Sequence, residues 1–197
     1  MSANTKVVPS GLRYFPEIIS VREEKDIIEW AVKIGSGKWQ QDRMRGQVTR
    51  RKYISFGWAY KLYSRTLIQA GRIPSVLKDI RALCSVHAEA SAKAFDQMVL
   101  IKYPIGAGIG AHTDAPCFGP VVLGLSLGTS CQMLFTHSNL RDFKLLLEPR
   151  SLLVLSGESR FSWTHEIASL RRERMAVIIR SRMQSVGESR VNQVAGD

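Results

Sequence analysis

The chain has 197 residues, 45% of them hydrophobic, so it is long enough for one domain with a sizeable core and too short for two. A net charge of +11 favours polyanionic partners such as nucleic acid without selecting one. Three widely spaced cysteines exclude a disulfide framework, and no apolar run reaches the roughly 18 residues of a membrane span. With no signal-peptide core at the amino terminus, we expect a monomeric intracellular protein, cytoplasmic or nuclear, that does not bind membranes.

Two helices are predicted in the first half of the chain. Ser20 and Glu23 form a capping-box pattern, and apolar residues at helical spacing behind them predict a helix over 21–34. A proline in the first turn and a second periodic run predict a helix over 74–95. His87 lies on the apolar face of that helix, so we interpret it as a packed core residue and not as a metal ligand.

A basic stretch between these helices runs directly into an aromatic one. Cations can neutralise phosphates there, while flat rings can stack on an unpaired or flipped base. We therefore expect nucleic-acid contacts from Arg43, Arg45, Arg50, Arg51, Lys52 and Trp58. The alternative is a solvated loop followed by a strand whose alternating rings, Phe56, Trp58 and Tyr60, face the core.

Residues 97–103 are rich in branched and aromatic side chains and predict a strand, which Pro104 and a glycine-rich loop bring to an end. The loop leads to His112 and Asp114, and residues two apart in an extended segment point the same way. They can offer one imidazole and one carboxylate to a single metal ion. Two His and one carboxylate suit Fe(II) enzymes that activate oxygen, but a His-x-Asp pattern by itself is a weak signal.

The remaining chain consists of short strand-like runs separated by turn signals, at 121–127, 131–135, 144–147, 151–155 and 175–179. This pattern, after two helices, predicts a mainly β, α+β fold: a sandwich or jelly-roll barrel with helices packed on one side. Of the remaining histidines, His137 lies in a polar turn, whereas His165 ends an apolar and aromatic segment that can hold a ligand rigidly.

Arg174 and Arg180 flank the apolar run 175–179. Their even separation along a strand puts both guanidinium groups on one face. Two inward arginines would need an anion, and a dicarboxylate cosubstrate would satisfy them because guanidinium binds carboxylate through two hydrogen bonds. The alternative, which spacing alone favours, is that they cap a strand edge at the surface.

In order and context these motifs resemble the AlkB family of Fe(II)- and 2-oxoglutarate-dependent dioxygenases. The resemblance is carried by Tyr103, His112 with Asp114, the segment SLLVLSGESRFSWTH at 151–165, Arg174 with Arg180, and similarities at 11–15, 51–60 and 73–74. It points to the branch that contains the tRNA wobble-uridine hydroxylase domain and its single-domain relatives.

The resemblance implies a double-stranded β-helix with two amino-terminal helices on one side. Residues of about 1–95 would form an amino-terminal extension with the substrate-recognition region, about 97–183 the jelly-roll core, and 184–197 a flexible tail. Iron would be held by His112, Asp114 and His165.

The same resemblance assigns the cosubstrate site, with 2-oxoglutarate and O2 as cosubstrates. Arg174 would hold the distal carboxylate of 2-oxoglutarate, Tyr103 would hydrogen-bond to it, and Arg180 would lie beside it. The family often has Asn where this chain has Ile101 and a polar residue where it has Ala176. Each departure removes a possible hydrogen bond to the cosubstrate.

The expected reaction is oxidation, above all demethylation, of a modified or alkylated base in RNA or DNA, with 2-oxoglutarate converted to succinate and CO2. Hydroxylation of a tRNA wobble-uridine side chain is an alternative within nucleic acid. A protein-directed hydroxylase or demethylase and a non-catalytic nucleic-acid-binding module that has kept the barrel are the others.

Overall fold

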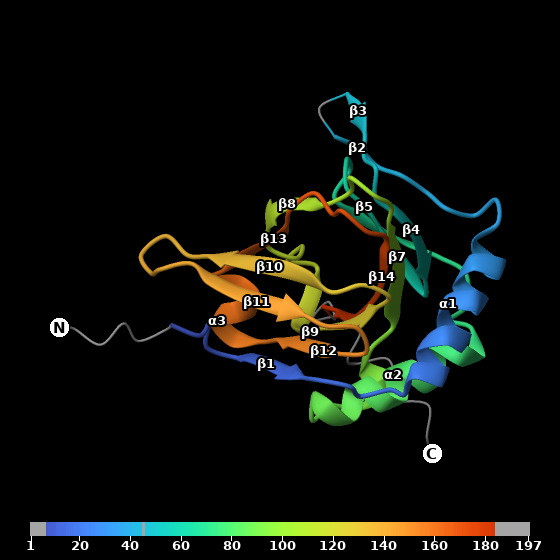
Figure 1. Ribbon diagram of the computed structural model, residues 1–197, viewed down its shortest axis with the longest axis horizontal. Helices are drawn as coiled ribbons and strands as arrows, with labels where there is room; N and C mark the ends of the chain where they lie inside the picture. The colour runs from blue at the N-terminus through green and yellow to red at the C-terminus, as the bar shows by residue number, and fades with distance from the viewer. Residues whose placement is uncertain (1–6, 45, 184–197) are drawn as a thin grey trace, which may run out of the picture.

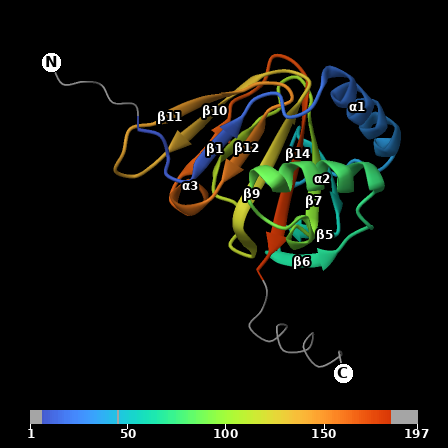
Figure 2. The same ribbon diagram turned by 90° about the horizontal axis from the view of Figure 1, so that it is seen from below.

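Two antiparallel sheets face each other as a jelly roll that does not close into a barrel, and two helices lie outside the larger sheet (Figures 1 and 2). This is a computed structural model, and it describes residues 7–44 and 46–183. The predicted fold class is thereby confirmed. The expected tail at 184–197 lies outside the described residues. No helix in the described ranges is both long enough and apolar enough to cross a membrane.

The two facing sheets carry ten of the strands found in the described ranges. The larger sheet contains, in spatial order, β1 (Leu12–Phe15), β12 (Leu152–Leu155), β9 (Phe118–Leu127), β14 (Arg174–Arg182), β7 (Gln97–Tyr103) and β4 (Lys52–Phe56). The smaller sheet contains β11 (Phe143–Leu147), β10 (Cys131–Thr136), β13 (Thr164–Ile167) and β8 (Ile109–His112). The five strand-like runs predicted after residue 120 all correspond to strands, and β7 has its predicted bounds.

Two short hairpins stand apart from these sheets. One pairs β2 (Arg43–Met44) with β3 (Gln47–Val48), and the other pairs β5 (Trp58–Lys61) with β6 (Thr66–Gln69). The sequence patterns did not predict these hairpins, although the alternative interpretation placed Trp58 and Tyr60 on a core strand. Figure 1 shows the β2–β3 hairpin projecting at the top of the molecule.

The central strands β7 and β14 are buried on both faces. On β7, Met98 and Leu100 belong to the cluster packed under the helices, whereas Val99, Ile101 and Tyr103 face the smaller sheet. Burial on both sides explains why these strands are almost continuously apolar. The inward face is therefore where a polar side chain is costly and informative.

Helix α1 (Val21–Gly35) matches its prediction to within one residue. The backbone N–H of Glu23 donates to the Ser20 hydroxyl at 3.2 Å, and the Glu23 carboxylate accepts from the Ser20 N–H at 2.7 Å, so the capping box is present. Ile27 and Ala31 are buried against the larger sheet. The predicted helix start therefore follows from local hydrogen bonding together with an apolar face.

Helix α2 (Ser75–His87) ends eight residues before the predicted end, so that boundary was wrong. The chain turns at Glu89, whose φ of 55° no helix can continue, and a short 3-10 helix, η1 (Ala92–Ala94), follows. Alanines beyond the turn prolong the helical pattern without prolonging the helix. His87 packs against Phe15 with 4.7 Å between ring centroids, which agrees with its interpretation as a packed residue.

Candidate active site

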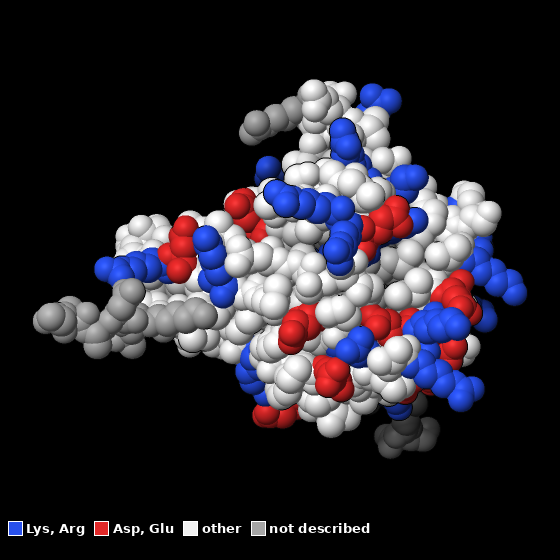
Figure 3. Space-filling model, in the orientation of Figure 1, with Lys and Arg blue, Asp and Glu red and all other residues white. Residues whose placement is uncertain are grey.

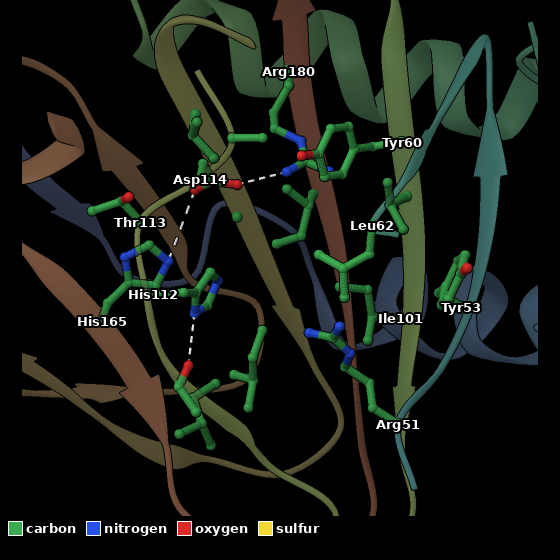
Figure 4. Close-up of a pocket in the computed structure, with 18 of the residues that line it drawn as sticks. Arg51, Tyr53, Tyr60, Leu62, Ile101, His112, Thr113, Asp114, His165 and Arg180 are labelled. Carbon is green, nitrogen blue, oxygen red and sulfur yellow. Dashed lines mark hydrogen bonds and ion pairs between the residues drawn. The ribbon is translucent and has the colours of Figure 1, made fainter. Parts of the chain in front are cut away.

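A cavity of about 420 Å³ lies between the two sheets. Strands β7, β9 and β14 form one wall, and β8 and β13 form the opposite wall, while β2 and β5 contribute side chains at its edge. Its charged lining side chains are Asp42, Arg51, Asp114 and Arg180, of which Figure 4 labels the last three. The rest of the lining is largely apolar, so charges placed here interact more strongly than in water.

The residues marked from the sequence as metal ligands lie side by side in this cavity. His112 on β8 and His165 on β13 are cross-strand partners, with 4.4 Å between their ring centroids. The Nε2 atom of His165 lies 3.8 Å from Oδ2 of Asp114, which follows the end of β8 (Figure 4). The pairing of β8 with β13 thus brings together side chains that are more than 50 residues apart.

Both histidines are held in the neutral form, in which a ring nitrogen can offer its lone pair to a metal ion. Nδ1 of His112 lies 2.8 Å from the Gly110 carbonyl oxygen, which can only accept, so Nδ1 carries the proton and Nε2 is free to bind a metal. Burial lowers the pKa of His112, and burial together with the nearby His112 lowers the pKa of His165 to about 4. In the described part of the chain, Nδ1 of His165 has no hydrogen-bond partner.

Asp114 is an ionised carboxylate held by Arg180, with 2.6 Å between Oδ1 and the guanidinium. Burial alone would raise the pKa of Asp114, but the positive charge of Arg180, helped by His165 and Arg160, brings it below its usual value. The described ranges hold no three acidic, His or Cys side chains already closed around one metal position. To bind one ion together, the free Oδ2 of Asp114 and the ring nitrogens of His112 and His165 would have to turn toward a common point. Two neutral imidazoles and one carboxylate are a donor set that fits Fe(II).

Arg160, which the sequence analysis did not single out, holds the loop that carries Asp114. It is 1% exposed on α3 (Gly157–Phe161) and donates to the carbonyl oxygens of Asp114 and Ala115 at 3.0 Å and of Phe118 at 3.4 Å. A buried guanidinium needs such acceptors. No local signal in the sequence marks it, because its neighbours in the chain include Glu158 and three serines.

Arg174 is buried on the same face of β14 as Arg180, so the expectation of a shared face is confirmed and the surface-edge alternative is wrong. Its guanidinium donates to Ser126 Oγ at 3.0 Å and to Cys131 Sγ, and lies 5.5 Å from the ring centroid of Tyr103. No acidic side chain among the described residues pairs with it, and its Nε has no acceptor there. Tyr103 lines the cavity, whereas Arg174 is not among its lining residues.

Ile101 and Ala176 are cross-strand partners on β7 and β14, and both are buried in the cluster beside the cavity. Ile101 lines the cavity, and neither of these two side chains can form a hydrogen bond. Hydrogen bonds to a bound dicarboxylate would have to come from other residues of the site.

The edge of the cavity carries an acidic, a basic and a phenolic side chain that interact. The Tyr53 hydroxyl donates to Asp42 Oδ1 at 2.9 Å, and the Arg51 guanidinium lies 3.6 Å from Asp42 Oδ2. Burial, reinforced by Asp42, raises the pKa of Tyr53 to about 12. Asp42 and Tyr53 were not predicted as site residues, and no local signal marks them.

The other residues expected to contact nucleic acid are spread around this edge. Arg43 on β2 and Arg50 are exposed, Lys52 is half-buried, and Arg45 lies outside the described residues. Trp58 is half-buried, with the Arg182 guanidinium 3.9 Å from a ring centroid. Figure 3 shows Lys and Arg side chains over the part of the surface that carries β2, β3 and β5.

The alternative interpretation of the aromatic run as one core strand is wrong. Gly57, at φ 73°, ends β4 and begins the turn into β5, where a Cβ would lie 1.9 Å from the Asp96 carbonyl oxygen. Phe56 is buried on β4, while Trp58 and Tyr60 are half-buried on the β5 hairpin. Only one of the three rings therefore belongs to the core.

Comparison with known sequences identifies similar proteins. Residues 11–194 match the model of the 2OG-Fe(II) oxygenase superfamily. The tRNA (carboxymethyluridine(34)-5-O)-methyltransferase ALKBH8 of Mus musculus is 33% identical over 172 residues, which are 82% of this chain and 25% of that protein. The alkylated DNA repair protein ALKBH8 homolog of Arabidopsis thaliana is 25% identical over 183 residues, 80% of this chain and 50% of that protein. This chain thus spans about a quarter to a half of these curated relatives.

Solved structures share the fold. The structure of OsALKBH1 superimposes with a TM-score of 0.71 at 20% identity, covering 90% of this chain and 99% of that one. The Trichoplax adhaerens prolyl hydroxylase in complex with a hypoxia inducible factor peptide fragment gives a TM-score of 0.65 at 13% identity, covering 87% of this chain and 83% of that one. At these identities the likeness concerns the jelly roll alone.

Proposed function

Because the chain belongs to the 2OG-Fe(II) oxygenase superfamily, and within it to the AlkB family near the ALKBH8 branch, we propose that it is a dioxygenase that oxidises a modified or alkylated base in RNA or DNA. The observation that carries the proposal is the meeting of His112, Asp114 and His165 in a cavity between the sheets. Two imidazoles and one carboxylate on one side of a metal ion leave its other positions open.

In this proposal Nε2 of His112, the carboxylate of Asp114 and His165 hold Fe(II). Bound iron, with 2-oxoglutarate and O2, would supply the oxidant for a substrate C–H bond. The chain keeps the two imidazoles unprotonated by burial, and the Gly110 carbonyl orients His112. Arg180 and Arg160 hold the carboxylate and the loop that bears it beside the two histidines, so only local side-chain rotations are needed for the three to share a metal.

Arg174 is the proposed partner of the distal carboxylate of 2-oxoglutarate, with Tyr103 beside it on the neighbouring strand. A buried guanidinium that lacks an acidic partner in the described ranges is costly, and a carboxylate would offset that cost through paired charge-assisted hydrogen bonds. The apolar wall formed by Ile101 and Ala176 limits water around this ion pair.

Nucleic acid is the proposed substrate on the strength of the relatives and of charge. ALKBH8 is named as a tRNA carboxymethyluridine methyltransferase, and its Arabidopsis homolog as an alkylated DNA repair protein. The net charge of +11 suits a polyanion, and Arg51 stands at the edge of the cavity. Demethylation is the leading reaction. The 33% identity to ALKBH8 favours hydroxylation of a uridine side chain in tRNA as the second candidate.

Succinate formation tests the reaction, and mass spectrometry of nucleosides tests the substrate. Purified protein with Fe(II), 2-oxoglutarate and O2 should form succinate when given modified tRNA, other RNA or alkylated DNA, and His112→Ala should not. Formaldehyde release indicates demethylation, and a nucleoside heavier by one oxygen indicates hydroxylation. Succinate formation with a protein substrate only would identify a protein-directed enzyme, and nucleic-acid binding without turnover beyond the His112→Ala control would identify a binding module.

A further inference from the structure

Gln97, the first residue of β7, is a polar side chain with no role in the scheme above. It is 0% exposed, lines the cavity and is the cross-strand partner of Arg180. Its Oε1 accepts a hydrogen bond from the Nε of Arg180 at 2.7 Å, while another nitrogen of that guanidinium donates to Asp114. Gln97 thus contacts the arginine that holds Asp114, a proposed metal ligand.

The orientation of the Gln97 amide is fixed by chemistry. An Arg Nε–H can only donate, so the atom facing it must be the amide oxygen, and the amide nitrogen points elsewhere. Within the described ranges this nitrogen, Nε2, is buried and has no hydrogen-bond partner. Buried donors are almost always satisfied, and an exception at a cavity wall indicates a missing acceptor.

We propose that Gln97 is a recognition residue that donates its Nε2–H to an unprotonated oxygen, a carboxylate or carbonyl oxygen, of the molecule bound beside Arg180. The inference rests on the proposed function, because it places the ligand in the same cavity. The neighbouring guanidinium supplies positive charge, so the site favours an oxygen that carries full or partial negative charge.

The position of Gln97 limits what that oxygen can belong to. Tyr103 and Gln97 are the two ends of the cavity face of β7, and their cross-strand partners on β14 are Arg174 and Arg180. If the distal carboxylate of the cosubstrate occupies the Tyr103 end, the Gln97 end receives a different group. Two sources remain: the keto-acid end of the cosubstrate, or a carbonyl oxygen of the substrate.

Gln97→Glu tests the inference with little change of shape. The new carboxylate still accepts from Arg180, but it has no N–H to donate and repels an anionic oxygen. Gln132→Glu, the same change at an exposed position on β10, is the matched control. The measurements are the Kd of 2-oxoglutarate by calorimetry on the Mn(II)-loaded protein, the Kd of a modified tRNA-derived oligonucleotide by fluorescence, and the thermal unfolding midpoint.

We expect Gln97→Glu to weaken one of these two affinities roughly ten- to a hundredfold, the range of a lost hydrogen bond to a charged group, and Gln132→Glu to leave both unchanged. Weaker binding of 2-oxoglutarate identifies the cosubstrate as the source of the oxygen, and weaker binding of the oligonucleotide alone identifies the substrate. If Gln97→Glu does not fold, Gln97→Met, which also lacks the donor, should show the same loss.

A Gln97 variant that binds both ligands as tightly as the wild-type protein would overturn this inference and leave the proposed function standing. A wild-type protein that binds neither ligand would overturn both.

Discussion

Arg174, at the start of β14, and Arg180, near its other end, lie on the same face of the strand, yet their surroundings differ. Arg180 has a carboxylate, Asp114, at 2.6 Å, and a buried amide, Gln97, at 2.7 Å. Arg174 has a hydroxyl and a thiol, and no acidic partner among the described residues. A charge already matched by the chain organises other protein groups, whereas a buried charge that the chain leaves unmatched is available to a ligand. The neighbours of each arginine therefore decide its role.

Removing Asp114, the carboxylate that pairs with Arg180, should have the largest effect. Asp114→Ala deletes a proposed metal ligand and leaves Arg180, whose side chain is only 14% exposed, without its carboxylate. We expect succinate formation to fall at least about 100-fold and the free energy of unfolding to fall by about 3 kcal/mol, because a lone buried charge is costly. Turnover assays and urea denaturation measure the two effects. Asp26→Ala, exposed on α1, should change neither, and full turnover by Asp114→Ala would contradict the site.

Replacing each arginine by methionine sharpens the comparison directly. In the absence of ligands, Arg180→Met should destabilise the protein by about 2–3 kcal/mol, because Asp114 loses its ion pair, whereas Arg174→Met should change stability by less than about 1 kcal/mol or increase it. Binding should show the opposite order: Arg174→Met should weaken 2-oxoglutarate binding about 100-fold through lost charge-assisted hydrogen bonds. Urea denaturation and calorimetry on the same samples test both halves. Equal destabilisation by the two variants would contradict the proposed difference between Arg174 and Arg180.

Acid should lower the stability of the metal-free protein through the buried His165. The folded-state pKa of His165 is about 4, below the ordinary 6.5, so protonation favours the unfolded chain. Its contribution is fully present above pH 6.5 and is lost as the pH falls toward 4, by about 2–3 kcal/mol for this residue. Denaturation of the metal-free protein between pH 7 and 4 should show this loss. It should be flatter in His165→Gln than in His137→Gln, and parallel curves would argue against a buried neutral His165.

The smallest effect is expected at the cavity edge, away from both ends of β14. Arg51→Ala should weaken nucleic-acid binding only a few-fold, because one phosphate contact among several is lost. The slope of log K against log salt should become shallower by about 1 if Arg51 contacts a phosphate. Fluorescence titrations at several salt concentrations measure the slope. Arg22→Ala, exposed on α1, should leave it unchanged.

The sequence predicted those features whose physical causes are local. The bounds of β7 and the start of α1 follow from side-chain periodicity and from a cap within four residues. The end of α2 could not be read in this way, because the left-handed turn at Glu89 interrupts residues that favour a helix. His112, Asp114 and His165 were found because the family resemblance supplied the long-range connection.

The side chains that support the candidate site were missed because their partners lie far away along the chain. Gln97 and Arg180 are 83 residues apart, and Arg160 and Asp114 are 46 apart. One signal was present for Gln97: it is separated from Tyr103 by an even number of residues, so its amide shares the inward face of a buried strand. For Asp42, only the folded chain shows the nearby phenol of Tyr53.

Strand β1 pairs along its four residues with β12, whose own four residues, Leu152–Leu155, are all buried. Without β1, an apolar strand with free backbone N–H and C=O groups would form the outer edge of the sheet. Such an edge can pair with another chain and start aggregation. An expression fragment that begins after Phe15 would therefore be prone to insoluble assembly, even though every residue of the cavity would still be encoded.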